Sequence, residues 1–352
     1  MVAPDALSVQ RDERGLWLPA IGLWLDPIQP APFSFVSHAH ATRAVGGGGR
    51  ALASRETLAL ARALGVGEDP PPGADWREPV AGNAQALGWD EVREVAVDPA
   101  FGGGVARLSI APAGHVLGAA QLVVDWGDRR LVYTGDWSGE ADAIRPAGAI
   151  VPCDVLVVTT TFGLPIFCFE PPGQVLEGLV AWCASRLTDG ITPVVLAHTP
   201  GPAQLIVRAL SARGLPVSGD DAVRRACTVY EELGVVLGPV RPHEGGARAR
   251  GGGRAVVASA AGRATNLRAR GRFEVAYASG WALLDAAVER KRADAAFALA
   301  DQADYDGLLG LVRASGARRV LTTRGEARTF ASLLPVQAHA LEMPAIDDRG
   351  GS

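Results

Sequence analysis

Apolar residues in the first half of the chain occur in short runs that are bounded by turn residues. These strand-like segments are residues 17–27, 33–40, 106–118, 120–136 and 153–162. Gly127 and Asp128 lie between two apolar runs, which predicts a hairpin turn. Residues 55–65 instead carry apolar side chains at helical spacing and stop at a glycine, so they predict a helix. The first half is therefore expected to be rich in β-strands.

The pattern changes at about residue 172, where helical and strand-like segments begin to alternate. "GQVLEGLVAWCASRL" (173–187) and "PAQLIVRALSARG" (202–214) have the spacing of amphipathic helices, and "TPVVLAH" (192–198) between them is strand-like. Residues 304–334 predict helix, strand and helix, and the chain after Met343 is expected to be loose. This alternation is typical of βαβ units in a mixed α/β protein.

Composition narrows the class of partner. The chain has 352 residues, 48% of them hydrophobic, with a formal net charge of −4 and a pI near 5.9, so no global charge attracts nucleic acid. A local basic concentration includes Arg248, Arg250, Arg254, Arg268, Arg270 and Arg272. This arginine concentration is either a solvated loop or an arm that contacts nucleic-acid phosphates.

Four scattered cysteines argue against a disulfide framework or a thiolate zinc site. No run approaches the length of a membrane span, so a cytoplasmic protein is expected.

Candidate metal ligands follow several of the predicted strands. "FVSHAHATR" places His38 and His40 one residue apart, "PAGHVLGAAQ" contains His115, and "VYTGDW" contains Asp136. Neutral imidazole and carboxylate groups are ligands that suit zinc or manganese. The sequence therefore predicts a metal site built from loops that follow these strands.

The same motifs resemble, in order, those of the β-CASP group of the metallo-β-lactamase fold. The match includes "WLDPIQP", "CDVLVVTTTFGLPIF", the Ser-Gly-Trp segment at 279–281 and "VLTTRGEA", and it is most similar to bacterial ligase-associated DNA exonucleases. The resemblance implies an αββα sandwich with an inserted α/β domain. It implies a metallo-β-lactamase domain from 1–168, a β-CASP-like insert at 169–280, a return to the first domain at 281–343, and a tail at 344–352.

The resemblance also implies roles for the motif residues. His38, His40 and His115 would bind the first metal, Asp136 would bridge toward a second metal, and Asp26 would accept a hydrogen bond from a ligand imidazole. At most one zinc ion is expected, with manganese as the other possibility. Asp136 and Asp301 are the candidate catalytic carboxylates.

Five family positions carry replacements on the second-metal and proton-transfer side. They are Thr42, Arg43, Thr159, Gln302 and Arg324. A guanidinium keeps its proton and cannot bind zinc, although it can hold a carboxylate or a phosphate. The sequence therefore predicts that the second metal and the general acid are lost.

Three functions follow from these observations. The first is a nuclease homologue that binds nucleic-acid ends, most simply DNA, with lost or much reduced catalysis. The second is a working single-metal phosphodiesterase or exonuclease in DNA repair. The third is a small-molecule hydrolase of the wider fold. By family analogy, a DNA ligase or helicase is an expected partner.

Overall fold

The computed structural model describes residues 5–42, 49–65, 83–243, 253–260 and 272–341. The chain forms two compact units, of which the first combines Met1–Ile166 with Gln302–Asp347. The second unit comprises Phe167–Asp301. Within the described ranges, no helix is both long enough and apolar enough to cross a membrane.

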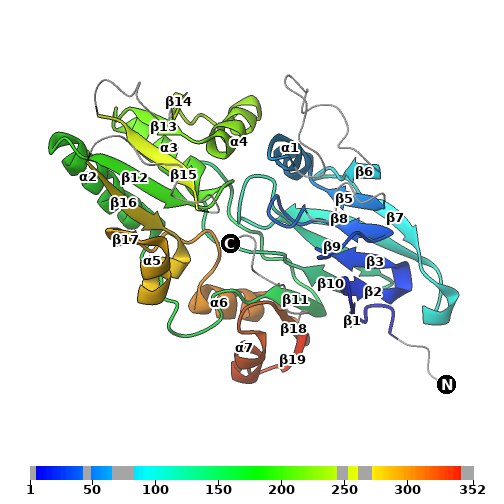
Figure 1. The fold of residues 1–352 in the computed structure, drawn as a ribbon. Helices are drawn as coiled ribbons and strands as arrows, with labels where there is room; N and C mark the ends of the chain where they lie inside the picture. The colour runs from blue at the N-terminus through cyan, green and yellow to red at the C-terminus, as the bar shows by residue number, and fades with distance from the viewer. Residues whose placement is uncertain (1–4, 43–48, 66–82, 244–252, 261–271, 342–352) are drawn as a thin grey trace. The chain divides into compact units, whose positions relative to one another are not determined.

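The first unit contains one six-stranded sheet, sheet A, and one seven-stranded sheet, sheet B (Figure 1). Sheet A has the order β1 (Gln10–Asp12), β2 (Gly15–Leu18), β3 (Leu23–Leu25), β4 (Phe33–Phe35), β5 (Arg50–Ala53) and β6 (Asn83–Ala86). Sheet B has the order β19 (Gln337–Leu341), β18 (Arg319–Thr323), β11 (Val155–Thr159), β10 (Arg129–Tyr133), β9 (Ala120–Trp126), β8 (Val105–Pro112) and β7 (Arg93–Ala96).

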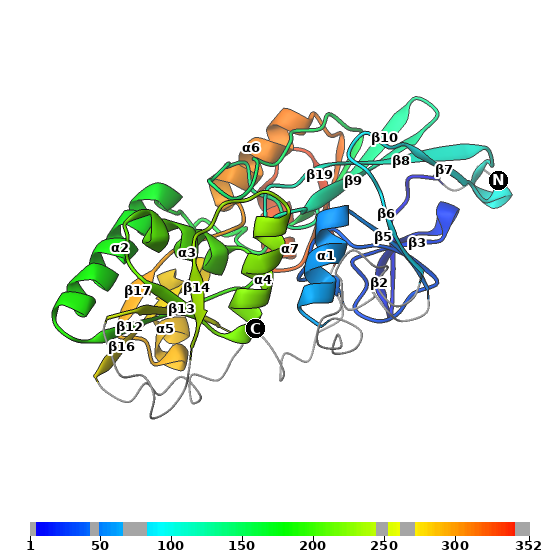
Figure 2. The same ribbon diagram turned by 90° about the horizontal axis from the view of Figure 1, so that it is seen from above.

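The main core of this unit lies between the two sheets. Alternate residues of the strands, among them Phe35, Leu122 and Tyr133, point into it and are almost fully buried. The other face of sheet B packs against α6 (Tyr305–Ser315) and α7 (Ala327–Leu333) through a second apolar cluster (Figure 2). Helix α1 (Arg55–Ala63) lies beside β6 of sheet A. These layers form the αββα sandwich expected from the sequence.

Several predicted elements are shorter in the structure. The 17–27 segment divides into two strands around a turn of 3₁₀ helix, η1 (Pro19–Ile21), because Gly22 adopts a left-handed conformation with φ of 59°. The 33–40 strand ends at Phe35, so both histidines of the motif lie in a loop. The hairpin at Gly127 and Asp128 is confirmed by the pairing of Trp126 with Arg129. Helix α1 is confirmed, and the side chain of Ser54 caps it by accepting from the N–H of Thr57 at 3.0 Å.

The second unit contains sheet C, in which every pair of neighbouring strands is parallel. Its order is β14 (Val240–Pro242), β13 (Val217–Gly219), β15 (Ala255–Ser259), β12 (Thr192–Ala197), β16 (Phe273–Ala278) and β17 (Ala295–Phe297). Helices α2 (Pro172–Thr188), α3 (Pro202–Ala212) and α4 (Asp221–Glu232) pack along its strands, and α5 (Asp285–Lys291) follows the short η5 (Gly280–Leu283). The βαβ pattern predicted from the sequence is therefore present.

The second compact unit continues to Asp301, and the domain bounds expected from the sequence stay a prediction. Strand β17 pairs with β16 and extends sheet C, and α5 packs against the apolar face of β12 and β16. The compact units divide at Ile166 and at Asp301, and the predicted tail after 343 lies outside the described residues.

Candidate metal centre

Four loops that follow strands of the first unit deliver the predicted ligands to one edge of the two sheets. Asp26 follows β3, and His38 and His40 follow β4 of sheet A. His115 follows β8 and Asp136 follows β10 of sheet B. Strands β8 and β10 both run antiparallel to β9, so their carboxyl ends meet at the same edge.

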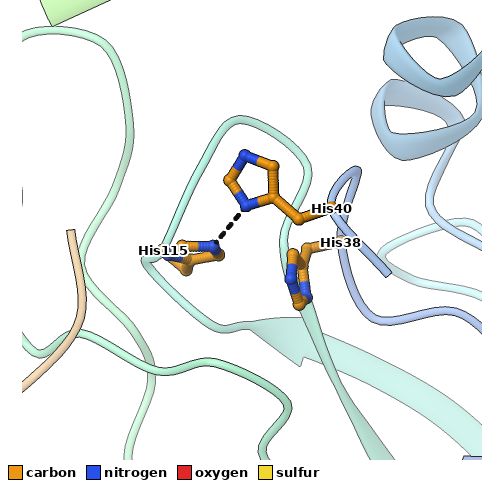
Figure 3. A group of neighbouring side chains, drawn as sticks. All are labelled: His38, His40 and His115. Carbon is orange, nitrogen blue, oxygen red and sulfur yellow. Dashed lines mark hydrogen bonds between the residues drawn. The ribbon is translucent and has the colours of Figure 1, made fainter. Parts of the chain in front are cut away.

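The three histidines converge on one point (Figure 3). One ring nitrogen from each of His38, His40 and His115 lies within 4.8 Å of the others, and Nδ1 of His40 is 3.0 Å from Nε2 of His115. His38 and His115 are 3% and 1% exposed, so their rings cannot turn freely toward water. This cluster could hold a metal ion.

The spacing of the three rings fits a single ion. A tetrahedral zinc ion with bonds of about 2.0–2.1 Å places its ligand nitrogens roughly 3.3 Å apart. The His40–His115 separation is 3.0 Å and the ligand atoms all lie within 4.8 Å of one another, so small ring movements would complete the geometry. Without an ion, the contact between Nδ1 of His40 and Nε2 of His115 is a hydrogen bond in which one ring donates, and a metal ion would take the place of that proton.

Asp136 adds a carboxylate to the cluster. Its Oδ2 lies 3.5 Å from Nε2 of His38 and 3.8 Å from Nε2 of His115. The same oxygen accepts a hydrogen bond of 3.0 Å from Nε2 of Gln302. A neutral amide therefore occupies one side of the carboxylate, where the family resemblance implies a proton-donating imidazole.

A chain of hydrogen bonds fixes the ring of His38. Asp26 accepts from the Ser37 N–H at 2.7 Å through Oδ1 and from the Ser37 hydroxyl at 2.5 Å through Oδ2. Because the Ser37 hydroxyl donates to Asp26, its oxygen is the acceptor for Nδ1–H of His38 at 2.7 Å. That tautomer leaves the Nε2 lone pair of His38 directed toward Asp136. The sequence predicted a direct bond from an imidazole to Asp26, whereas this connection passes through Ser37.

Asp26 lies in a buried, charged network. Burial raises the pKa of the Asp26 carboxyl above its ordinary value. The positive charge of Arg324 and hydrogen bonds from Ser37 and Tyr133 oppose that rise. The Tyr133 hydroxyl donates to Oδ2 of Asp26 at 2.7 Å, and burial together with the nearby carboxylate raises the pKa of Tyr133 well above its ordinary value.

Arg324 completes this network from the end of β18. Its guanidinium donates to the main-chain oxygen of Asp26 at 3.3 Å and lies near Tyr133, whose hydroxyl donates to the carboxylate of the same aspartate. Burial by itself lowers the pKa of the guanidinium. The neighbouring Tyr133, Asp136 and Asp26 outweigh that effect, so the pKa of Arg324 rises above its ordinary value and the group stays charged.

Several known proteins are similar to this chain in sequence, and a solved structure is similar to it in fold. A probable DNA ligase of Opitutus terrae is 31% identical over 327 residues, which cover 91% of this chain and 29% of the ligase. An RNase J-like protein of Methanocaldococcus jannaschii is 26% identical over 158 residues, covering 42% of this chain and 36% of the relative. The endoribonuclease ysh1 of Emericella nidulans is 41% identical over 63 residues, covering 16% of this chain and 7% of the relative.

The RNase J-like and ysh1 relatives are β-CASP proteins of the metallo-β-lactamase fold. This chain is a relative of the β-CASP metallo-β-lactamase proteins. It spans only 29% to 36% of the length of the first two relatives. No protein-family model matches it. A crystal structure of an Enterococcus faecalis V583 protein of unknown function shares the fold, with a TM-score of 0.55 over 89% of this chain and 79% of that chain at 13% identity.

The β-CASP positions that carry replacements have different surroundings. The Thr42 hydroxyl is buried and donates to the main-chain oxygen of Ala39 at 3.2 Å, so it closes a turn of the histidine loop. Thr159 ends β11 with a buried hydroxyl that has no hydrogen-bond partner within the described part of the chain. Arg43 lies outside the described residues. Asp301 ends the second compact unit, and its catalytic role stays a prediction.

The predicted nucleic-acid arm of this β-CASP relative is described only in part. Arg254 directly precedes β15 and Arg272 directly precedes β16, so both lie at the amino ends of parallel strands in sheet C. The remaining members of the set lie outside the described residues; they are Arg248, Arg250, Arg268 and Arg270. The binding role of the set stays a prediction.

Sequence reasoning missed three residues that position the cluster: Ser37, Tyr133 and Arg145. Arg145 is 7% exposed, pairs with Asp142 at 2.7 Å, and donates to the main-chain oxygens of Gly114 and His115, the latter at 2.7 Å. It therefore holds the loop that carries the third histidine. Only the position of Ser37 beside His38 offered a local signal, because the other contacts join residues far apart in the sequence.

Proposed function

We propose that this chain is a nucleic-acid-binding β-CASP homologue that holds one divalent ion and has lost most or all phosphodiester cleavage. The observation that carries the proposal is the environment of Asp136. Its Oδ2 lies beside two imidazoles and also accepts from the amide of Gln302, and the positive charge of Arg324 lies nearby. An amide donor and a guanidinium do not bind a second divalent ion.

His38, His40 and His115 would hold the ion, with Asp136 beside it. Zinc is the ion that three imidazoles fit best, and when bound it supplies Lewis acidity and a lowered pKa for coordinated water. The chain's own residues would orient these ligands through Ser37 and Arg145. Gln302 holds Asp136 in place but has no ionisable proton for a leaving group. Loss of a general acid alone typically reduces the rate by about 10²–10⁴-fold.

The substrate class rests on the relatives. Two of them are named as ribonuclease-type proteins and one as a probable DNA ligase, which supports nucleic acid as the partner. In the Opitutus protein a region similar to this chain makes up 29% of a much longer protein. That arrangement supports a DNA ligase as a partner and DNA repair as the setting.

Metal stoichiometry on the native protein is the first measurement that tests this proposal. We expect close to one ion per chain, and close to none in the His38→Ala, His40→Ala double variant. His339→Ala is a matched control, since His339 is an exposed histidine of β19 at the far edge of sheet B. Two ions per chain would contradict the proposal.

A nuclease assay on end-labelled single- and double-stranded DNA is the second measurement. We expect binding without metal-dependent cutting above the level of the double variant. Strong cutting that the double variant abolishes would instead favour a single-metal phosphodiesterase, a function that the convergence of the three histidines also supports. We expect the Gln302→His, Arg324→His double variant to gain a second ion, because both substitutions return imidazoles to the site.

A further inference from the structure

Two backbone positions beside the metal centre have an unusual conformation. Asp26 and Arg324 have φ of 43° and 58°, in the left-handed region that residues other than glycine rarely adopt. The two residues are far apart in sequence, yet the Arg324 guanidinium donates to the main-chain oxygen of Asp26 at 3.3 Å. Such conformations persist only where the surrounding contacts impose them, and they concentrate at functional sites.

The side chain of Arg324 has to cross β11 to make its contacts. Strand β11 lies between β18 and β10 in sheet B, and Arg324 at the end of β18 reaches Tyr133 at the end of β10. Thr159 ends the intervening strand, and it pairs in register with Thr323. The guanidinium therefore lies across the carboxyl edge of three neighbouring strands, on the face that Tyr133 shares with the core.

Hydrogen bonds connect this guanidinium to His38, one of the candidate metal ligands, through Asp26 and Ser37. The guanidinium donates to the main-chain oxygen of Asp26 at 3.3 Å, and the Tyr133 hydroxyl donates to the Asp26 carboxylate at 2.7 Å. The Ser37 hydroxyl also donates to Asp26, at 2.5 Å, which leaves its oxygen to accept from His38 at 2.7 Å. Asp26 thus accepts hydrogen bonds from Tyr133 on one side and from Ser37 on the other. It keeps that role only while a nearby positive charge balances its buried carboxylate.

We propose that Arg324 is a positioning residue that keeps the ring proton of His38 on Nδ1, acting through Asp26 and Ser37. The effect is that Nε2 of His38 faces the centre of the cluster before any ion arrives. Arginine suits this position better than lysine, because a guanidinium stays charged when buried and offers several N–H groups in fixed directions. The link to metal binding rests on the proposed metal centre, whereas the state of the His38 ring does not.

Nitrogen NMR of the metal-free protein tests the proposal directly. At about pH 8, above the ordinary histidine pKa of about 6.5, a neutral ring reports which nitrogen carries the proton. We expect His38 in the unaltered chain to carry it on Nδ1, with the signal assigned by its absence in His38→Ala. We expect Arg324→Met to give a mixture of both tautomers and Arg324→Lys to restore part of the Nδ1 form. Arg319→Met, at the opposite end of β18, is the matched control and should change nothing.

Tyr133→Phe provides a second variant in case Arg324→Met does not fold. It removes a hydroxyl that donates to the Asp26 carboxylate beside Ser37, and we expect it to shift the His38 tautomer in the same direction. A proton on Nε2 in the unaltered chain would overturn the proposal. So would an unchanged tautomer in folded Tyr133→Phe and Arg324→Met proteins.

Zinc affinity, measured by competition with a chelator, tests the consequence. Removal of a partner behind a metal ligand typically weakens binding by about 10–100-fold, and we expect that range for Ser37→Ala and about 10-fold for Arg324→Met. Because both act through one connection, the double variant should be no weaker than Ser37→Ala alone. Losses that multiply would show independent actions and contradict the proposal. If no variant, including the unaltered chain, binds zinc, the proposed function fails, while the NMR result still decides the role of Arg324.

Discussion

Two adjacent threonines in β18 should respond in opposite ways to the same substitution. Thr323 is 1% exposed, and its Oγ1 has no hydrogen-bond partner among the residues that the structure describes. Thr322 is 0% exposed, and its Oγ1 donates to the main-chain oxygen of Ala327 at 2.7 Å. Valine has nearly the same shape as threonine, so replacement changes the hydroxyl and little else.

The expected magnitudes follow from burial and pairing. A buried hydroxyl without a partner costs about 1–3 kcal/mol of desolvation, so Thr323→Val should raise the free energy of unfolding by about 1 kcal/mol. Thr322→Val removes the buried hydrogen bond to the Ala327 oxygen, so it should lower the free energy of unfolding by about 1–2 kcal/mol. The two variants should therefore differ by roughly 2–3 kcal/mol although the substituted residues are neighbours.

Urea titration of both variants beside the unaltered chain measures this difference. Equal slopes of free energy against urea are needed, because they show that the unfolded state is unchanged. Thr159→Val should behave like Thr323→Val, since its hydroxyl is also buried and unpaired. If Thr323→Val destabilises the protein as much as Thr322→Val does, the hydroxyl of Thr323 has a partner and the reasoning is refuted.

Three further predictions concern the support of the site and its pH dependence. Arg145→Met should lower the free energy of unfolding by about 1–3 kcal/mol, because it removes the guanidinium bonds to Asp142 and to the main-chain oxygens of Gly114 and His115, and urea titration checks it. It should also weaken zinc binding about 10–100-fold by releasing the loop of the third histidine, as chelator competition would show. Gly135→Ala should destabilise by more than about 1 kcal/mol and reduce zinc affinity. The reason is that φ is 56° there and a Cβ would lie 2.5 Å from the Ser37 hydroxyl, and thermal unfolding with chelator competition measures both effects. The pKa of Asp154 lies below its ordinary 3.8, mainly because the N–H of Arg130 donates to its carboxylate. Its stabilising effect is therefore full above that pH and is lost as the pH falls through the lower, folded-state value. Asp154→Asn should flatten the pH dependence of stability below about pH 4, and an unchanged acid limb would contradict the assignment.

The sequence predicted the elements that depend on local patterns. The helix at 55–65 and the hairpin at Gly127 were recognisable because a capping serine, regular apolar spacing and a turn glycine are all local signals. The His38–His40 pair and His115 were found because they follow apolar strands. The end of β4 at Phe35 was missed, since the apolar Val36 continues the strand pattern into the loop while bonding to the main chain of Leu52.

The supporting groups could not be predicted from local patterns. Tyr133 has the sequence character of an ordinary buried strand residue, and only the approach of Asp26 from another sheet gives its hydroxyl a partner. Arg145 lies in a loop with no regular pattern, and its role depends on carbonyls thirty residues earlier in the chain. Such contacts depend on tertiary packing, which a single sequence does not encode at short range.

The order of strands in sheet B has a consequence for synthesis of the chain. Strand β18 covers the edge of β11, yet the whole second unit lies between them in sequence. A ribosome therefore releases β11 long before its neighbour exists, so the apolar edge of Val155–Thr159 stays open in the nascent chain. The three histidines can come together during that interval, but the guanidinium of Arg324 is made only after the second unit. During synthesis the three imidazoles are therefore present before Arg324 is. A chaperone or a metal ion from solution can bind them at that stage.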